Sequence, residues 1–395
     1  MVFGAVGALL LEWTVFRPRP QKVPIVVSAL PPSTPVNAPA PHELEARIRI
    51  NRCVDLYSYV CALSRTKDPT GDVRRDSEGE VEALRIYESI IRSGKRLTRT
   101  KIEELLVQKI YTPERTGRVR ELFADVKERL LHFIEAQPFQ ALSIEDKKLL
   151  KSRVERVRLE LPPPMSVYAD EPGLFTRNDV FYERAREQNP RIRVGGALLF
   201  TVKSRFNLAF TLAHELAHSI DPCELKADDV DILSYRGLSE CFGTPVPELS
   251  AECKPEGKLS EIFADWVATH VVADVIARSS SGFTRAQTRT AVYSAVRDLC
   301  REEDSREEDA QESKEEGISV LKTEGKTESL SSEHPNEAFR VNRIFAQHPQ
   351  IRKYLGCKEM EGPELPGMPS YCFWPVGKKA ASVPASSPPA EKIAH

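Results

Sequence analysis

Three features that would assign a chain to a broad class are missing from this sequence. There is no Cys-x-x-Cys pair, which argues against a structural zinc ribbon and a thioredoxin-type redox motif. There is no excess of basic residues, because the formal net charge is -2, so no nucleic-acid partner is expected. Beyond the first residues there is no apolar run long enough to span a bilayer.

Cysteine is present eight times, and these residues are dispersed along the chain. They are Cys53, Cys61, Cys223, Cys241, Cys253, Cys300, Cys357 and Cys372. An even number of dispersed cysteines favours disulfides formed in an oxidising compartment. The alternative is a set of buried free thiols in a cytosolic protein.

The N-terminal stretch "VFGAVGALLLEWTVF" resembles the apolar part of a signal peptide in length and is short for a membrane span. Glu12 interrupts it, but we favour an export signal or a short membrane anchor over a plain hydrophobic N-terminus. Residues 17–42 are rich in proline and are interpreted as an extended tether. Residues 1–42 are therefore a signal or anchor with a tether. We expect the rest of the chain outside the cytoplasm, which means extracellular, periplasmic or membrane-anchored.

Residues 43–161 have a helical pattern of apolar residues. One helix is expected to begin with Thr112 as its N-cap and Pro113 as its first residue. A second is expected to begin after Ser143, which is also a good N-cap. The three prolines at 162–164 should end that helix and mark a domain boundary.

After these prolines, "MSVYAD" and "RIRVGGALLF" predict short strands of a small sheet. The stretch "SEIFADWVATHVVADVIA" predicts a strong helix with Ser260 as its N-cap. A further helix, "TRAQTRTAVYSAVRDL", is expected to start near Thr284. The predicted fold class is therefore α+β and mostly helical.

Residues 162–374 are interpreted as one domain with a charged insertion. The insertion, residues 301–331, begins with an acidic run that lacks aromatic residues and cannot bury enough apolar surface to fold. Residues 375–395 are expected to be a disordered tail.

The stretch "TLAHELAHSID" contains the motif His214-Glu215-x-x-His218. Residues at i and i+4 lie on one face of a helix, so the two imidazoles can bind one metal ion. Glu215 lies beside them and can act as a general base. The alternative is an ordinary helix that carries two histidines.

A catalytic zinc site of this kind needs one more protein ligand, often a carboxylate. Glu261 is the favoured candidate, because it lies in the first turn of a strong helix and Asp265 follows it at i+4. Asp265 and Asp221 can each hold the second nitrogen of a ligand histidine. The other glutamates nearby lie in an irregular stretch where a ligand would be poorly held. The alternative for the Glu261 and Asp265 pair is a solvated acidic face.

The combination "HELAHSID" and "EIFAD" resembles the neprilysin and endothelin-converting-enzyme family of zinc endopeptidases. That family has His-Glu-x-x-His-x-x-Asp followed by Glu-x-x-x-Asp. Near the N-terminus, "CVDLYSYVC" resembles the opening of the family's ectodomain. Near the C-terminus, "HPNEAFRVNRIFAQHPQIRKYLGC" followed by "CFW" resembles its ending. Four motifs in this order are much more specific than the zinc motif alone.

The resemblance implies a zincin-type catalytic domain that binds one Zn²⁺ per chain. It implies hydrolysis of peptide substrates, with a preference for hydrophobic residues on the amine side of the cut. His214, His218 and Glu261 would be the zinc ligands. Glu215 would activate the attacking water as general base.

The resemblance also implies helper residues. Asp221 and Asp265 would orient the ligand histidines, with Asp265 in the catalytic set. His334 would donate a hydrogen bond to the oxyanion, and Arg340 would hold a substrate carbonyl or carboxylate. Asn178 is the nearest equivalent of the family's Asn-Ala dipeptide on an edge strand, although an aspartate follows it here.

The eight cysteines allow many pairings, and their spacing does not decide among them. The family pattern implies three disulfides and leaves two cysteines to form a fourth. The implied pairs are Cys53–Cys357, Cys61–Cys300, Cys253–Cys372 and Cys223–Cys241.

The main departure from the family is size, because its ectodomains are considerably longer than this chain. Residues 43–161 would be a reduced form of the helical domain that caps the active site, which suggests a more open cleft. Smaller departures are Ala213 and Ser219, where the family has glycine. A second hypothesis is therefore a catalytically silent relative that binds peptides or proteins. A third is a zinc hydrolase that acts on a non-peptide amide.

Overall fold

The structure is a computed structural model. It describes residues 49–67, 72–93, 97–136, 142–170, 172–184, 189–200, 204–227, 253, 258–300 and 335–358. All of these belong to one unit, Pro41–His395. The predictions for residues 1–42, 301–331 and 375–395 lie outside the described residues, as do those for His334, Cys241 and Cys372.

The first part of the described chain is helical, as predicted. Its helices are α2 (Leu56–Lys67), α3 (Asp72–Ile91), α4 (Arg99–Ile110), α5 (Pro113–Glu135) and α6 (Ile144–Arg156). Thr112 caps α5, with Pro113 as the first helical residue, and Ser143 caps α6. Later in the chain, Thr284 forms a capping box at the start of α12 (Arg285–Val296). These three predicted helix starts, at Thr112, Ser143 and Thr284, are confirmed.

The predicted end of α6 is wrong. The helix ends at Arg156, and strand β1 (Arg158–Glu160) follows before the prolines at 162–164. The strand pairs in parallel with a segment about thirty residues further along the chain. Its three residues continue the apolar pattern of the helix, so the sequence pattern could not separate the two elements.

The predicted strand "MSVYAD" is also wrong, because these residues form helix α7 (Met165–Asp170). The N–H of Val167 donates to the carbonyl of Pro164 at 2.9 Å and opens the helical turn. A short apolar segment fits helical and strand periods equally well.

A three-stranded mixed sheet contains β1, β2 (Val180–Glu183) and β3 (Arg191–Val194), in the order β1-β3-β2. Strand β1 runs parallel to β3, and β2 runs antiparallel to it at an edge of this sheet. The strand predicted within "RIRVGGALLF" is confirmed for its first four residues only. A Cβ at Gly195 would overlap the carbonyl of Arg177, so glycine is needed where the chain leaves β3.

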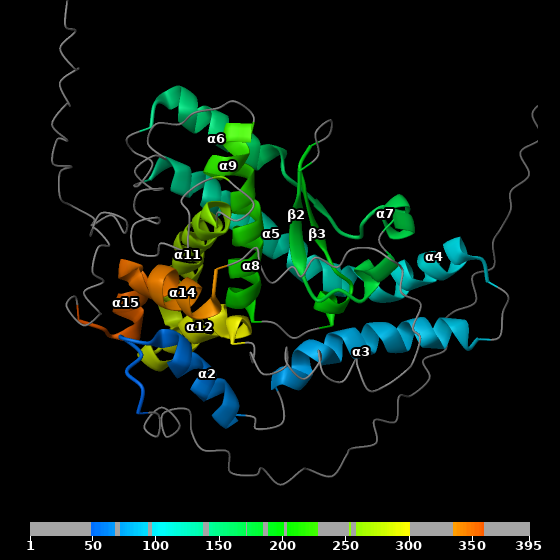
Figure 1. The fold of residues 1–395 in the computed structure, drawn as a ribbon, viewed down its shortest axis with the longest axis horizontal. Coiled ribbons are helices and arrows are strands. Elements are labelled where there is room, and N and C mark those ends of the chain that lie inside the picture. The colour runs from blue at the N-terminus through cyan, green and yellow to red at the C-terminus, as the bar shows by residue number, and fades with distance from the viewer. Residues whose placement is uncertain are drawn as a thin grey trace, which may run out of the picture. The chain divides into compact units, whose positions relative to one another are not determined.

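Helix α8 (Arg205–Ala217) is the central element of the fold and lies beside α11 (Leu259–Ser279) (Figure 1). It also packs against α5 and α12. Leu212 and Leu216 of α8 and Phe263 of α11 are completely buried in the shared core. The mostly helical α+β class, with a small sheet, is confirmed.

The last described segment packs against α11 and α2. It contains α14 (Glu337–Phe339), a π-helical turn (Arg340–Ile344), the 3₁₀ turn η9 (Phe345–Gln347) and α15 (Pro349–Leu355). Because the π-helical turn contacts α11, it brings Arg340 next to the helix that carries Glu261 and Asp265.

Three disulfides join described residues. Cys53–Cys357 and Cys61–Cys300 are confirmed. The implied pairs Cys253–Cys372 and Cys223–Cys241 are wrong, because Cys223 pairs with Cys253. Cys223 belongs to α9 (Pro222–Ala227), which packs against α11, and the spacing of cysteines in the sequence does not indicate such a contact between elements.

These disulfides indicate an oxidising compartment outside the cytoplasm. Among the helices that the structure describes, none has both the length and the apolar character needed to cross a membrane.

Candidate metal centre

The two histidines of the motif lie at the C-terminal end of α8. Ser204 caps the start of this helix by accepting a hydrogen bond from the Asn207 N–H at 3.0 Å. His214 lies in the last turn, and His218 begins the 3₁₀ turn η4 (His218–Ile220) that follows directly. The centres of the two imidazole rings are 5.0 Å apart. The predicted pair is therefore brought together.

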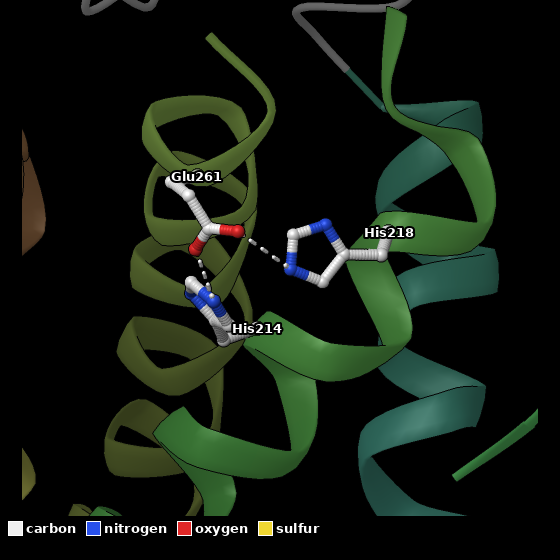
Figure 2. Close-up of side chains that lie close together, drawn as sticks. All are labelled: His214, His218 and Glu261. Carbon is white, nitrogen blue, oxygen red and sulfur yellow. Dashed lines mark hydrogen bonds and ion pairs between the residues drawn. The ribbon is translucent and has the colours of Figure 1, made fainter. Parts of the chain in front are cut away.

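Glu261 reaches both histidines from the first turn of α11 (Figure 2). Its Oε2 lies 3.1 Å from His214 Nε2, and its Oε1 lies 3.6 Å from His218 Nε2. One possible ligand atom from each residue lies within 4.8 Å of the other two. The three predicted ligands thus converge, although they come from two helices far apart in the sequence.

This group of side chains could hold a metal ion. Two imidazole nitrogens and one carboxylate oxygen form a ligand set typical of catalytic zinc sites. Both Nδ1 atoms have hydrogen-bonding partners, so the Nε2 atoms are the ones turned toward Glu261. The ligand types alone do not identify the metal, because imidazole and carboxylate also bind other divalent ions.

Asp265 supports His214 from the second turn of α11. Its Oδ1 lies 2.9 Å from His214 Nδ1, and the side chain is completely buried. Arg340 donates from Nε to Asp265 Oδ2 at 2.7 Å and from Nη2 to Oδ1 at 2.8 Å. Burial raises the pKa of Asp265, but Arg340 and His214 outweigh it and hold that pKa well below its usual range.

His218 has two partners at its Nδ1. Ser260 Oγ lies 3.2 Å from it, and Asp221 Oδ2 lies 3.4 Å from it. The predicted role of Ser260 as the N-cap of α11 is wrong. The helix begins at Leu259, one residue earlier, and the Ser260 hydroxyl instead donates to Asp221 at 2.9 Å.

Without a metal ion, the centre favours protonated histidines. Burial opposes a positive charge on His214, but hydrogen bonds to Asp265 and Glu261 outweigh it and raise its pKa to about 10. Burial likewise opposes the charge on His218, and the carboxylates around it, Asp221 first, raise its pKa. Protons therefore compete with a metal ion for both side chains.

Glu215 lies between the centre and the sheet. Its Oε2 accepts a hydrogen bond from the backbone N–H of Tyr182 in β2 at 2.7 Å. Burial is the main cause that raises the pKa of Glu215. The Tyr182 ring lies 6.1 Å from the ring of His218. The sequence did not predict this contact, since the motif does not indicate which strand residue faces it.

Two of the remaining predicted site residues are described. Arg340 reaches the centre through Asp265. Asn178 lies two residues before β2, on the segment that leads to Tyr182.

The centre is built from residues that the sequence motif and the first turn of α11 supply. No model of a known protein family matches this chain, and a search of curated proteins finds no match to it either.

Proposed function

We propose that this chain is a zinc-dependent endopeptidase and a shortened member of the neprilysin and endothelin-converting-enzyme family. The observation that carries the proposal is the convergence of His214, His218 and Glu261, with Glu215 beside them. The order of the four sequence motifs supports the family. The disulfides support an extracellular, periplasmic or membrane-anchored location.

His214, His218 and Glu261 would hold the zinc ion through Nε2, Nε2 and a carboxylate oxygen. Zinc bound there would act as a Lewis acid toward the scissile carbonyl and would make water more acidic. Asp265 would keep His214 oriented, with its Nδ1 protonated and its Nε2 available.

Glu215 would be the general base. It would take a proton from the attacking water at a carboxylate oxygen and deliver it to the nitrogen of the leaving amine. The Tyr182 N–H fixes Oε2 of this carboxylate in space, so Oε1 is the oxygen assigned to the proton transfer. A raised pKa suits this role, because it makes the carboxylate a stronger base.

The position of β2 supports a peptide as substrate. The N–H of Tyr182 points away from β3, because it donates to Glu215. An extended peptide that lay along this side of β2 would pass beside Glu215, with the Tyr182 N–H still bonded to Glu215. Arg340, which Asp265 holds in place, would contact a substrate carbonyl nearby.

The test is hydrolysis of a mixed library of quenched fluorescent peptides by the oxidised full chain. We expect cleavage that a chelator abolishes and added zinc restores, mostly before hydrophobic residues. Glu215→Gln should bind one zinc ion per chain and lose at least about 100-fold in rate, because the general base is gone.

Glu103→Gln is the matched control. Glu103 is also a buried glutamate, but it lies on α4 and pairs with Arg99 at 2.8 Å. Its variant should cleave like the unchanged protein. Zinc binding without cleavage of any peptide would reject the peptidase, and the peptide-binding hypothesis would replace it.

A further inference from the structure

The two ligand histidines are supported differently. His214 Nδ1 meets the carboxylate of Asp265 directly at 2.9 Å. His218 Nδ1 lies 3.4 Å from the carboxylate of Asp221, which is long for a hydrogen bond, and 3.2 Å from the hydroxyl of Ser260. The nearer partner of His218 is therefore a serine and not the aspartate that the motif supplies.

The carboxylate of Asp221 also accepts hydrogen bonds from other groups. Its Oδ1 accepts from the backbone N–H of Cys223 at 2.7 Å and from that of Glu224 at 2.9 Å, so it caps α9. Its Oδ2 accepts from the Ser260 hydroxyl at 2.9 Å. The carboxylate is completely buried. These three hydrogen-bond donors hold it in place, besides its contact with His218.

The direction of each hydrogen bond follows from the groups involved. An ionised carboxylate only accepts, so the single hydrogen of the Ser260 hydroxyl points to Asp221. The lone pairs of Oγ then accept from His218, whose Nδ1 must carry the proton. With a metal ion in place of the proton on Nε2, this arrangement would keep the remaining proton on Nδ1 and turn the Nε2 lone pair to the side of Glu261, as a metal ligand requires.

We propose that Ser260 is a positioning residue of the metal centre, which relays the hydrogen bond from His218 to Asp221. The inference depends on the proposed metal site. Ser260 comes one residue before the ligand Glu261, so one turn of α11 supplies a ligand and orients another. It also ties the end of α8 to the cap of α9.

The test is the zinc dissociation constant, measured by competition with a chromophoric chelator, together with the visible spectrum of the Co²⁺-loaded protein. Ser260→Ala should bind zinc about tenfold more weakly, because loss of such a partner typically costs 10- to 100-fold in affinity. It should also shift the Co²⁺ absorption bands, because His218 is then free to turn. Ser260→Thr keeps the hydroxyl and should restore most of the affinity and the original spectrum.

Ser219→Ala is the matched control. Ser219 is buried and adjacent to His218, but its hydroxyl donates to the carbonyl of Leu216 at 2.7 Å. Its variant should match the unchanged protein in affinity and spectrum. If Ser260→Ala does not fold, Ser260→Cys takes its place, because a thiol is a weak hydrogen-bonding group of similar size.

The outcomes separate the two proposals. Unchanged zinc affinity and an unchanged Co²⁺ spectrum in Ser260→Ala would overturn the role of Ser260 and leave the metal site intact. Failure of the unchanged protein to bind zinc would overturn the metal site itself, and the role of Ser260 with it.

Discussion

At the scale of single residues, Asp265 connects the metal ligand His214 to the guanidinium of Arg340. All three side chains are largely shielded from water, so each depends on the others for its hydrogen bonds. Removing the charge of Asp265 would leave the charge of Arg340 buried without its partner. Removing a buried partner in this way is strongly destabilising.

We predict that Asp265→Asn lowers the free energy of unfolding by about 3 to 5 kcal/mol and weakens zinc binding roughly 10- to 100-fold. Urea unfolding and chelator competition measure the two effects. Asp274→Asn, on the same helix, is the control, because Asp125 still pairs with Arg129 when Asp274 is changed. That control should cost about 1 kcal/mol or less. Equal losses in the two variants would contradict the proposed role of Asp265.

The raised pKa values of the ligand histidines predict how pH affects zinc affinity. With a pKa of about 10 in the metal-free protein, His214 must release a proton when zinc binds at neutral pH. The apparent affinity should therefore rise roughly tenfold for each pH unit above neutrality, since at least one proton is released. An ordinary histidine would give a nearly flat profile in that range. Chelator competition at several pH values measures it, and a flat profile above pH 7 would refute the prediction.

The same pKa has the opposite consequence for the metal-free fold. Because the pKa of His214 is raised from 6.5 to about 10, its ion pairs add stability that is fully present below pH 6.5. That stability is lost as the pH rises toward 10. High pH therefore weakens the metal-free protein while it favours the metal-loaded one.

The ligands could be predicted from the sequence because their placement is local. The spacing of His214 and His218 follows from one helix, and the position of Glu261 follows from the start of another. The partners that cross between elements could not be predicted. The backbone of Tyr182 meets Glu215, and the hydroxyl of Ser260 meets Asp221, only after the sheet and the helices have packed.

At the scale of elements, long helices with clear caps could be predicted, and short elements could not. Helix α5 carries its own start signals, Thr112 and Pro113, within a few residues. Strand β1 exists because Leu159 pairs with Ile192 on β3, which no local pattern indicates. The same dependence on distant packing explains why Cys223 joins Cys253.

Helix α11 also packs against the start of α15 through two histidines. His348 Nε2 lies 2.9 Å from His270 Nδ1, and the His270 ring stacks on Phe133 at 4.5 Å. Burial lowers the pKa of His348 to about 4. Burial, and then the charge of His348, lower the pKa of His270 well below its usual value. The pair is thus neutral at physiological pH.

We predict that this pair makes the fold sensitive to acid. The unfolded chain binds protons at the ordinary pKa of 6.5, whereas folded His348 does so only at about 4, so stability falls as the pH drops through this range. The loss from His348 is at most about 3 kcal/mol, since one pKa unit corresponds to about 1.4 kcal/mol. Urea unfolding of the metal-free protein between pH 7 and pH 4 measures it. His214 acts in the opposite direction there: it stays protonated in the folded state while the unfolded chain gains that proton, so its contribution to stability rises by about 1 kcal/mol or less as the pH falls from 7.

The variant for comparison is the double substitution His270→Leu with His348→Asn. Asparagine is a good residue at the N-cap position that His348 occupies before α15. The variant should lose less stability than the unchanged protein over the same pH range. Equal losses would assign the acid sensitivity to other groups.

At the scale of the whole described chain, two disulfides tie its first helix to its last elements. Cys53 and Cys61, before and within α2, pair with Cys357 after α15 and with Cys300 after α12. The paired residues are separated by 304 and 239 positions. Helices α8 and α11, which carry the metal centre, lie within both closed loops. The bridges therefore limit the unfolded chain on both sides of the centre.

We predict that the two long bridges are not independent. Once one of them has formed, Cys61 lies only a few residues from Cys53, so the second bridge closes a much shorter path than its separation of 239 positions suggests. Removing either pair of cysteines by alanine substitution should lower the free energy of unfolding by about 4 kcal/mol. Removing both should cost about 1 kcal/mol more than the sum, because the last bridge then constrains the full loop. Urea unfolding of the two double variants and the quadruple variant measures this difference.

Removal of the bridge Cys223–Cys253 serves as the control. That bridge closes its own short loop, with a separation of 30 positions. Combined with the loss of either long bridge, its effect should be additive within about 0.5 kcal/mol. The contrary outcome is that the quadruple variant loses only the sum of the free energies that the two double variants lose. The two long bridges would then act on the unfolded chain separately. The stability of the region around α8 and α11 would then depend on its own packing and not on the shared closure of the chain.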